Sequence, residues 1–524
     1  MNPPATLRAL HVPALAAGLL GLLAIIGGSF ALDRIARAQM RAHQIDTATR
    51  ILAALLHGDT PMRWSLNAAN DIITGAAIGA AASTVERDGL HVRADDDGFE
   101  VGLVLHAPLD LARYAVLELD VDAEAAGKFA VRTQHTRDGP SCISAPMPVV
   151  RGVQVLRLDL STLNWQCDDD STTPPVRTIL LRLRLDPLAG TSVRLANVRL
   201  RPASKVDPAA LDVLRLDMPI DAFALAVSEH QQASRWRVIE LDMQERVEPT
   251  LLAMDRIRTV APAAIIVPQG QYMRVLADAR AMPPAAAKST HRSTVLAWIA
   301  VAVLAATLAW VRLRPWPSPG RQAAAELAGT LGVPLALLAI GAIGDDLGAP
   351  TLVALGLCVT FAASLLKGDA PRQPATRTWL RGAAIAFASV AVAIAIVVVL
   401  RDPAQTWEWP PPQRILRYLG WAALQQFLVT VIVAERIARL TGSTRAAIVL
   451  AAFAFALLHA PNAMLMQFTF IGALLWTWNW QRHRALLANT LAHAVSGLVL
   501  ATGLPPEWLR SAEIGARYFL FGNY

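Results

Sequence analysis

The chain has 524 residues, of which 54% are hydrophobic and 17% charged, and its formal net charge is +7. A soluble globular chain carries about 25% charged residues, so this composition excludes an ordinary soluble protein. The Lys and Arg residues cluster at the ends of apolar stretches, without a basic stripe that interleaves aromatic residues, which excludes nucleic acid as a partner. The apolar excess lies in residues 10–32 and beyond residue 293, so we expect a membrane protein with a large extramembrane domain.

The first apolar stretch, residues 10–32, is long enough to cross a bilayer as a helix. The tripeptide at 36–38 resembles a signal-peptide cleavage site, but the charged residues Asp33 and Arg34 precede it. We interpret residues 1–32 as an uncleaved N-terminal membrane anchor, with a cleaved signal peptide as the alternative.

Residues 33–204 predict an extracytoplasmic β-sandwich. From about residue 85 to 202, apolar and polar residues alternate with period two, as in LLRLRLDP, which is typical of strands with one buried face. The segment TILLRLRLDPLAGTSVRLANVRLRP resembles the closing strands of jelly-roll domains of the galactose-binding and carbohydrate-binding type. That resemblance implies binding of a glycan or another envelope component, but a scaffolding sandwich without a ligand is the favoured interpretation.

The chain has three cysteines. Cys358 lies inside an apolar stretch and is interpreted as a small hydrophobic residue. Cys142 and Cys167 lie in the predicted extracytoplasmic domain, where we expect them to form a disulfide if that domain is outside the cytoplasm.

Residues 205–292 predict a mixed α/β segment. RWRVIELDM and AAIIVP are typical of strands, and VEPTLLAMDRIRTV is typical of an amphipathic helix. No catalytic motif occurs in this segment.

Eight more apolar stretches follow, and with the anchor they predict a polytopic α-helical membrane protein of about nine spans. We divide them into membrane helices at 293–414 and a C-terminal membrane domain at 415–503, followed by a tail at 504–524 that has no motif. The predicted spans are 293–313, 322–343, 349–366, 380–400, 415–435, 445–460, 462–480 and 485–503.

The positive-inside rule predicts the orientation of these spans. Basic residues such as Arg312, Arg377, Arg436 and Arg482 follow the second, fourth, sixth and eighth spans. The N-terminus is then cytoplasmic and residues 33–292 are periplasmic, in what we expect to be a bacterial inner membrane.

The last four spans carry few polar residues, and polar residues inside a membrane are costly and usually functional. Hydrogen bonding between helices is the simpler explanation for each of them taken singly. They are Gln425, Gln426, Thr430, His459, Asn462, Gln467, Asn489, His493 and Ser496.

Taken in order, three of these blocks resemble the CPBP family, the intramembrane proteases related to type II CAAX prenyl endopeptidases. That family shows a Glu-Glu pair followed by Arg on one helix, Phe-x-x-x-His on the next block and His-x-x-x-Asn on the last. Here QQFLVT begins at Gln425, FALLH ends at His459 and HAVSG begins at His493. The resemblance covers about residues 415–503 and implies an endopeptidase with a membrane-embedded protein or peptide as substrate.

This chain departs from the family pattern where the chemistry is most demanding. Glutamines Gln425 and Gln426 replace the glutamates, Thr430 replaces the arginine and Gly497 replaces the asparagine. Hydrolysis needs a proton acceptor, and an amide is not basic. Glu435, the one carboxylate of this helix, lies about 13 Å further along and is expected to be solvated.

Two hypotheses follow for the site residues Gln425, Gln426, His459 and His493. The chain is either a pseudoprotease that binds a membrane-embedded partner, which the chemistry favours, or an active variant in which a histidine is the base. No cofactor is assured. Zinc is disfavoured because two histidines and two glutamines are a poor ligand set.

Two functions of other classes are alternatives. The first is an envelope sensor or glycan-binding membrane protein that acts through its extracytoplasmic domain. The second is a transporter, which we disfavour because no intramembrane carboxylate or lysine is available for ion coupling.

Overall fold

The computed structural model divides into two compact units. One consists of residues 1–40, 246–249 and 289–519, and the other of residues 41–245, 250–288 and 520–524. The structure describes residues 11–520 apart from 96–97, 106, 137–138, 170–176, 217–235, 244–245, 283–289, 340–348, 367–375, 402–408 and 516, and the side chains of 11–22, 24 and 290–294 are also outside the description. The start of the predicted anchor, residues 1–10, therefore lies outside the described residues.

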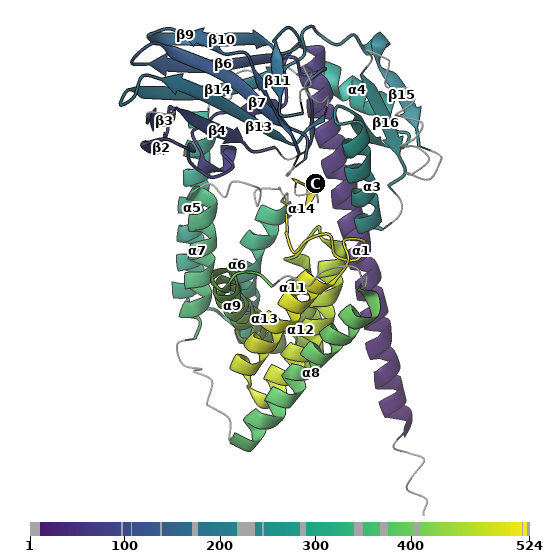
Figure 1. Cartoon of the computed structure of the whole chain (residues 1–524). Coiled ribbons are helices and arrows are strands. Elements are labelled where there is room, and N and C mark those ends of the chain that lie inside the picture. The colour runs from purple at the N-terminus through teal and green to yellow at the C-terminus, as the bar shows by residue number, and fades with distance from the viewer. Residues whose placement is uncertain are drawn as a thin grey trace, which may run out of the picture. The chain divides into compact units, whose positions relative to one another are not determined.

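The second unit is rich in β-strands (Figure 1). Six strands form one antiparallel sheet in the order β10-β6-β14-β3-β2, with β1 paired to β14, and six form another in the order β11-β8-β7-β13-β4, with β9 paired to β7. The first sheet contains β1 (Met62–Trp64), β2 (Ala82–Glu86), β3 (Gly89–Arg93), β6 (Val116–Ala123), β10 (Gly152–Asp159) and β14 (Ser192–Arg201). The second contains β4 (Phe99–Leu103), β7 (Gly127–Gln134), β8 (Ser141–Ser144), β9 (Met147–Val149), β11 (Trp165–Cys167) and β13 (Leu180–Pro187). A short ladder joins β5 (Leu109–Asp110) to β12 (Arg177–Thr178).

The alternating sequence pattern explains how these strands pack. On β13, Leu181 and Leu183 are fully buried, and they belong to a single hydrophobic core that draws on both six-stranded sheets. The arginines between them face the other way, and Arg182 and Arg184 lie 3.2 and 3.5 Å from the carboxylate of Glu100 on the neighbouring strand. The predicted β-rich N-terminal region is thus confirmed.

The remaining elements of this unit form a small α/β arrangement. Its three strands are parallel, in the order β15 (Asp212–Arg215), β16 (Arg237–Leu241) and β17 (Ile265–Pro268). The two helices are α3 (Val247–Val260), whose bounds match the expected amphipathic helix and whose first three residues belong to the first unit, and α4 (Tyr272–Ala281). Two short 3₁₀ turns, η1 (Ala69–Asp71) and η2 (Pro208–Ala210), lie in the connecting segments.

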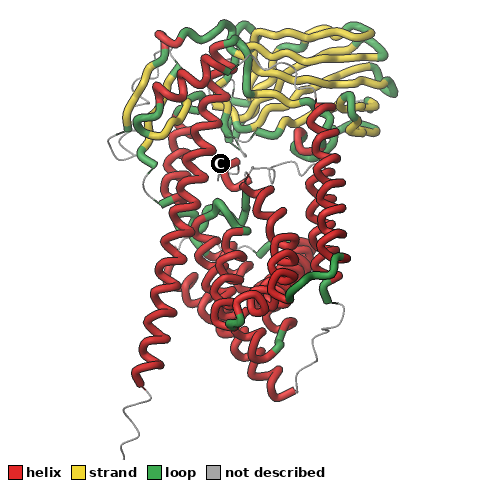
Figure 2. Tube along the Cα trace, turned by 180° about the vertical axis from the view of Figure 1, so that it is seen from behind, coloured by secondary structure: helices red, strands yellow, loops and turns green. Residues whose placement is uncertain are grey.

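The described part of the first unit is helical, as the red tubes of Figure 2 show. The described part of each stretch predicted as a span contains a helix. The helices are α1 (His11–Leu56), α5 (Thr290–Leu313), α6 (Pro319–Ala339), α7 (Ala349–Ser364), α8 (Thr376–Leu400), α9 (Pro412–Gln426), η3 (Phe427–Val433), α10 (Ala434–Thr441), α11 (Thr444–Leu457), α12 (Ala463–His483), α13 (Leu486–Gly503) and α14 (Arg517–Leu520). The last residues of α1 belong to the second unit.

Four helices of the described residues are long and apolar enough to cross a membrane, judged by length and composition. They are Val295–Leu313, Thr376–Leu400, Pro412–Thr441 and Leu486–Gly503. The apolar helices α7 and α11 are shorter. The composition-based prediction of a membrane protein is thus supported, and four of the expected spans are candidates by this measure among the described residues.

Small residues let α8 and α13 approach closely. Ala386 of α8 packs in one cluster with Ala485, Ala488 and Ala492. A Cβ at Gly382 would lie 2.7 Å from the Cβ of Ala485, so only glycine fits there without movement. Close approach of this kind is how membrane helices gain packing energy without a hydrophobic driving force.

A buried ion pair joins α6 to α10. Nε of Arg436 lies 2.7 Å from a carboxylate oxygen of Glu326, and both side chains are 6% exposed. Arg436 also donates to the carbonyl oxygen of Leu365. The expectation that no carboxylate lies inside a predicted span was wrong, because Glu326 falls within 322–343. Arg436 was likewise expected in a cytoplasmic loop and is instead buried between helices.

Cys142 and Cys167 face each other on β8 and β11 and form the expected disulfide. By the chain-entropy estimate, closing a loop of 25 residues contributes about 3 kcal/mol. Reductant should therefore lower the thermal unfolding temperature of the wild-type chain in detergent, and have no effect on the Cys142→Ala/Cys167→Ala variant. An unfolding temperature of the wild type that ignores reductant would contradict this assignment.

The ion pair predicts that substitutions of Glu326 and Arg436 have strongly non-additive effects on the free energy of unfolding. Arg436→Met leaves Glu326 buried without its charge partner and should cost about 3–5 kcal/mol, whereas the double variant Glu326→Leu/Arg436→Met should recover most of that loss. Arg439→Met, exposed on the same helix, is the matched control. Thermal unfolding in detergent measures all four proteins, and equal losses for the single and double variants would contradict the pairing.

Candidate functional site

The site is built by α9, α11, α12 and α13, which pack against one another in the helical unit (Figure 1). Gln426 is the last residue of α9, His459 follows the end of α11, and His493 lies in the middle of α13. All three side chains are at most 6% exposed. Residues separated by 67 positions in the sequence are thus in direct contact.

The central contact joins Gln426 to His493. Nε2 of Gln426 lies 3.2 Å from Nδ1 of His493. An amide nitrogen can only donate a hydrogen bond, so Nδ1 of His493 accepts it and the proton of the neutral ring is on Nε2. The other amide atom of Gln426, Oε1, is buried and has no hydrogen-bond partner among the described residues.

His459 has the opposite tautomer. Its Nδ1 lies 2.8 Å from the carbonyl oxygen of Phe455, one helical turn earlier. A carbonyl oxygen only accepts, so Nδ1 carries the proton and Nε2 carries the lone pair. The structure gives this Nε2 no hydrogen bond to a described residue. His459 is therefore the imidazole of the site that retains a free acceptor.

Phe455 links the two histidines. Its ring contacts the ring of His459 at 4.7 Å between centroids and that of His493 at 5.7 Å, both nearly perpendicular. Phe455 is 1% exposed, so this contact is dry. We call Gln426, His459, His493 and Phe455 the Phe455 cluster.

A second layer holds His493 in place. The ring of Trp476 lies over His493, with centroids 4.7 Å apart and planes tilted by 31°. The indole N–H of Trp476 donates to Ser389, whose hydroxyl lies 3.4 Å from that of Ser496. Asn489 donates to the carbonyl oxygen of Trp476. Asn489 and Ser496, both singled out from the sequence, thus support the site from behind.

The helix carrying Gln426 changes geometry directly after it. Residues Phe427–Val433 form the π-helical stretch η3, and such stretches are frequent at functional sites. Thr430, which stands where the resembled family has arginine, donates to the carbonyl oxygen of Gln426 at 2.6 Å. Thr430 therefore acts on the backbone of α9.

Two residues considered in the sequence analysis, Gln425 and Glu435, lie outside the Phe455 cluster. Gln425 is half-buried and makes no hydrogen bond with the described residues, so only Gln426 of the pair reaches His493. Glu435 was expected to be solvated. It is instead half-buried and accepts hydrogen bonds from Trp480, Gln481 and Arg484. Its carboxylate is thus committed to α12 and its C-terminal cap.

Asn462 has a structural role. Its side chain accepts from the N–H of Leu465 and caps α12, and it donates to the carbonyl oxygen of Ser511 in the C-terminal tail. The carboxylate of Glu248 accepts from the neighbouring N–H of Met464. The tail, which carries no recognisable motif, is therefore held against the start of α12.

The donor atoms of the site are a poor match for zinc. Nδ1 of each histidine already makes a hydrogen bond, to Gln426 or to Phe455, and no carboxylate or thiol of a described residue forms a metal-binding group with them. Among the described residues, a group of three or more His, Cys, Asp or Glu side chains able to share an ion occurs elsewhere. The Phe455 cluster therefore does not fit zinc, whose sites need three or four protein ligands.

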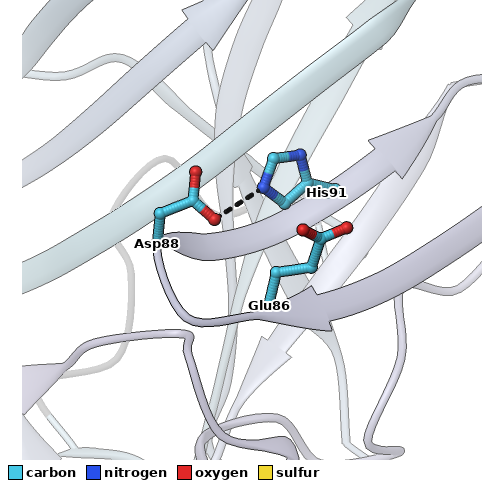
Figure 3. A group of neighbouring side chains, drawn as sticks. All are labelled: Glu86, Asp88 and His91. Atoms are coloured by element: carbon cyan, nitrogen blue, oxygen red, sulfur yellow. Dashed lines mark hydrogen bonds and ion pairs between the residues drawn. The ribbon is translucent and has the colours of Figure 1, made fainter.

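That other group is Glu86, Asp88 and His91 on the hairpin β2–β3 (Figure 3). Their ligand atoms lie within 4.8 Å of one another. Nε2 of His91 lies 2.9 Å from Asp88, and the hydrogen bond lowers the pKa of that carboxyl. The guanidinium of Arg194 is 3.8 Å from Asp88. Since both carboxylates are exposed and a fixed cation is already present, these residues form a surface ion-pair group.

Three contributors were missed at the level of sequence. Tyr418 lies edge-on to His493 at 6.4 Å between ring centroids, and Trp476 stacks on the same ring. Glu326 was overlooked as a buried charge. For Tyr418 a signal existed, because it precedes Gln426 by eight residues and so shares its side of α9.

Residues 407–499 match the family described as type II CAAX prenyl endopeptidase Rce1-like. The matched segment covers α9 and most of α13 and contains every member of the Phe455 cluster. Among curated proteins, none matches the chain. The resemblance expected from the three sequence blocks is confirmed, and the chain carries a type II CAAX prenyl endopeptidase Rce1-like domain over residues 407–499.

Proposed function

We propose that the Rce1-like segment binds a membrane-embedded protein or peptide and is a pseudoprotease. The observation that carries this proposal is the hydrogen bond from the Gln426 amide to Nδ1 of His493. It places a neutral donor beside an imidazole, where hydrolysis would need a proton acceptor.

The positions of the protons on the side chains of the Phe455 cluster argue against efficient hydrolysis. The Nδ1 lone pair of His493 is taken by Gln426, and its Nε2 carries a proton and can only donate. Gln426 cannot remove a proton from water. Glu435 is committed to α12. The free lone pair on Nε2 of His459 is the one remaining basic group, without a carboxylate to orient it or to stabilise its charged form.

The same hydrogen-bond donors and acceptors favour binding of a peptide group. Leaving the buried Oε1 of Gln426 without a partner costs about 1–3 kcal/mol, which a ligand N–H would offset. Nε2–H of His493 offers a donor and Nε2 of His459 an acceptor. A peptide group presents both an N–H and a C=O, and in a bilayer it has no water to satisfy them. A membrane-embedded peptide therefore matches these atoms better than an apolar lipid chain does.

The proposal includes the topology expected from the sequence. The N-terminus would be cytoplasmic and residues 33–292 periplasmic, in a bacterial inner membrane crossed about nine times, with the two six-stranded sheets forming a jelly-roll-like sandwich. The Cys142–Cys167 disulfide supports an oxidising compartment for that region. The envelope-sensor or glycan-binding hypothesis gains no comparable support from the described residues.

Gln426→Glu should create proteolysis. A carboxylate at this position accepts the proton of Nδ1, which moves the His493 lone pair to Nε2 and supplies a base worth about 10²- to 10⁴-fold in rate. We expect the wild type to leave a single-span reporter peptide intact in proteoliposomes and Gln426→Glu to cleave it, as measured by mass spectrometry of the fragments. Gln425→Glu is the matched control, because its side chain does not reach His493.

Cleavage by the wild type that is lost in His459→Ala would contradict the pseudoprotease and establish a histidine-based endopeptidase. Absence of cleavage by Gln426→Glu, in a variant that unfolds at the wild-type temperature, would show that the replaced carboxylate is not what the site lacks.

A further inference from the structure

The hydroxyl of Tyr418 occupies space that exists only because residue 497 is glycine. A Cβ built on Gly497 would lie 2.0 Å from the Tyr418 hydroxyl oxygen and 3.0 Å from Cζ of the ring. The first distance is too short for any side chain at 497 to coexist with this position of the tyrosine hydroxyl. Gly497 lies one helical turn after His493 on α13, so the hydroxyl sits beside the Phe455 cluster.

The Tyr418 hydroxyl has no hydrogen bond to any described residue, although its ring is packed edge-on to His493. Tyr418 is half-buried and its helix, α9, also carries Gln426. One helix therefore brings two polar atoms to His493, the Tyr418 hydroxyl through its ring contact and the buried Oε1 of Gln426, which has no hydrogen-bond partner among the described residues.

We propose that Tyr418 is a ligand-binding residue whose hydroxyl donates a hydrogen bond to a main-chain carbonyl oxygen of the membrane-embedded peptide. This inference rests on the proposed function. A phenol O–H is a neutral donor that keeps its proton, and Oε1 of Gln426 is an acceptor, so together they match the C=O and the N–H of a peptide backbone. Recognition through the main chain tolerates many peptide sequences.

The inference also explains a departure from the family pattern. Gly497 stands where the resembled proteases have asparagine, and its lack of a side chain removes one amide donor. Tyr418 reaches into that space from a different helix and brings a donor of its own. The missing side chain at Gly497 thus leaves the space that the Tyr418 hydroxyl occupies.

The test uses the full chain in proteoliposomes and a single-span peptide that carries photo-leucine, with binding titrated by cross-linking. Tyr418→Phe removes only the hydroxyl and should weaken binding by roughly 3- to 10-fold, the usual worth of one hydrogen bond. Tyr418→Ala/Gly497→Asn removes the ring and returns an amide donor to the same space, so it should restore most of the binding. Gly420→Ala, on the same helix with open space around it, is the matched control.

The outcomes separate the two proposals. Wild-type binding with Tyr418→Phe equally tight would overturn the role of Tyr418 and leave the proposed function standing. A loss in Tyr418→Phe that the double variant does not restore would assign the tyrosine to packing and would also overturn the inference. Absence of cross-linking to the wild type would overturn the proposed function itself, and the inference with it.

Discussion

The side-chain amide of Gln426 donates to Nδ1 of His493, and the chemistry open to the Phe455 cluster depends on that bond. A carboxylate in the same place would accept the Nδ1 proton and leave Nε2 basic. The amide reverses the arrangement and leaves Nε2 protonated. Under the proposed function, an amide in place of a carboxylate therefore supplies a donor where hydrolysis would need a base. Binding of a peptide group needs donors and acceptors, and that requirement is still met.

The surroundings hold this arrangement firmly. Phe455 separates the two imidazoles, and Trp476 covers the other side of His493. Ser389 and Asn489 fix Trp476 through its indole N–H and its carbonyl oxygen. Such outer contacts limit the orientations open to a ring, which is how a site keeps its geometry before a ligand arrives. The Phe455 cluster is thus held in place by contacts from residues outside it.

Much of the fold could be predicted because it depends on local periodicity. Alternation predicted strands such as β13, and the amphipathic helix α3 was predicted with its observed bounds. Three spaced motifs predicted the family and placed Gln426, His459 and His493 on the correct helices. The spacing could not show which glutamine faces His493, because that depends on how α9 is rotated and on where the π-helical stretch begins.

Contacts between helices that are distant in the sequence depend on how the helices pack side by side, which periodicity does not show. The Glu326–Arg436 pair and the contact of Tyr418 with Gly497 were missed for this reason. The most direct measurement is the tautomer of His493 in bilayers, read from ¹⁵N chemical shifts of the ring nitrogens and assigned with His493→Ala. We expect an unprotonated Nδ1 and a protonated Nε2. A protonated Nδ1 with a bare Nε2 would mean that Gln426 accepts rather than donates, and would return a base to the site.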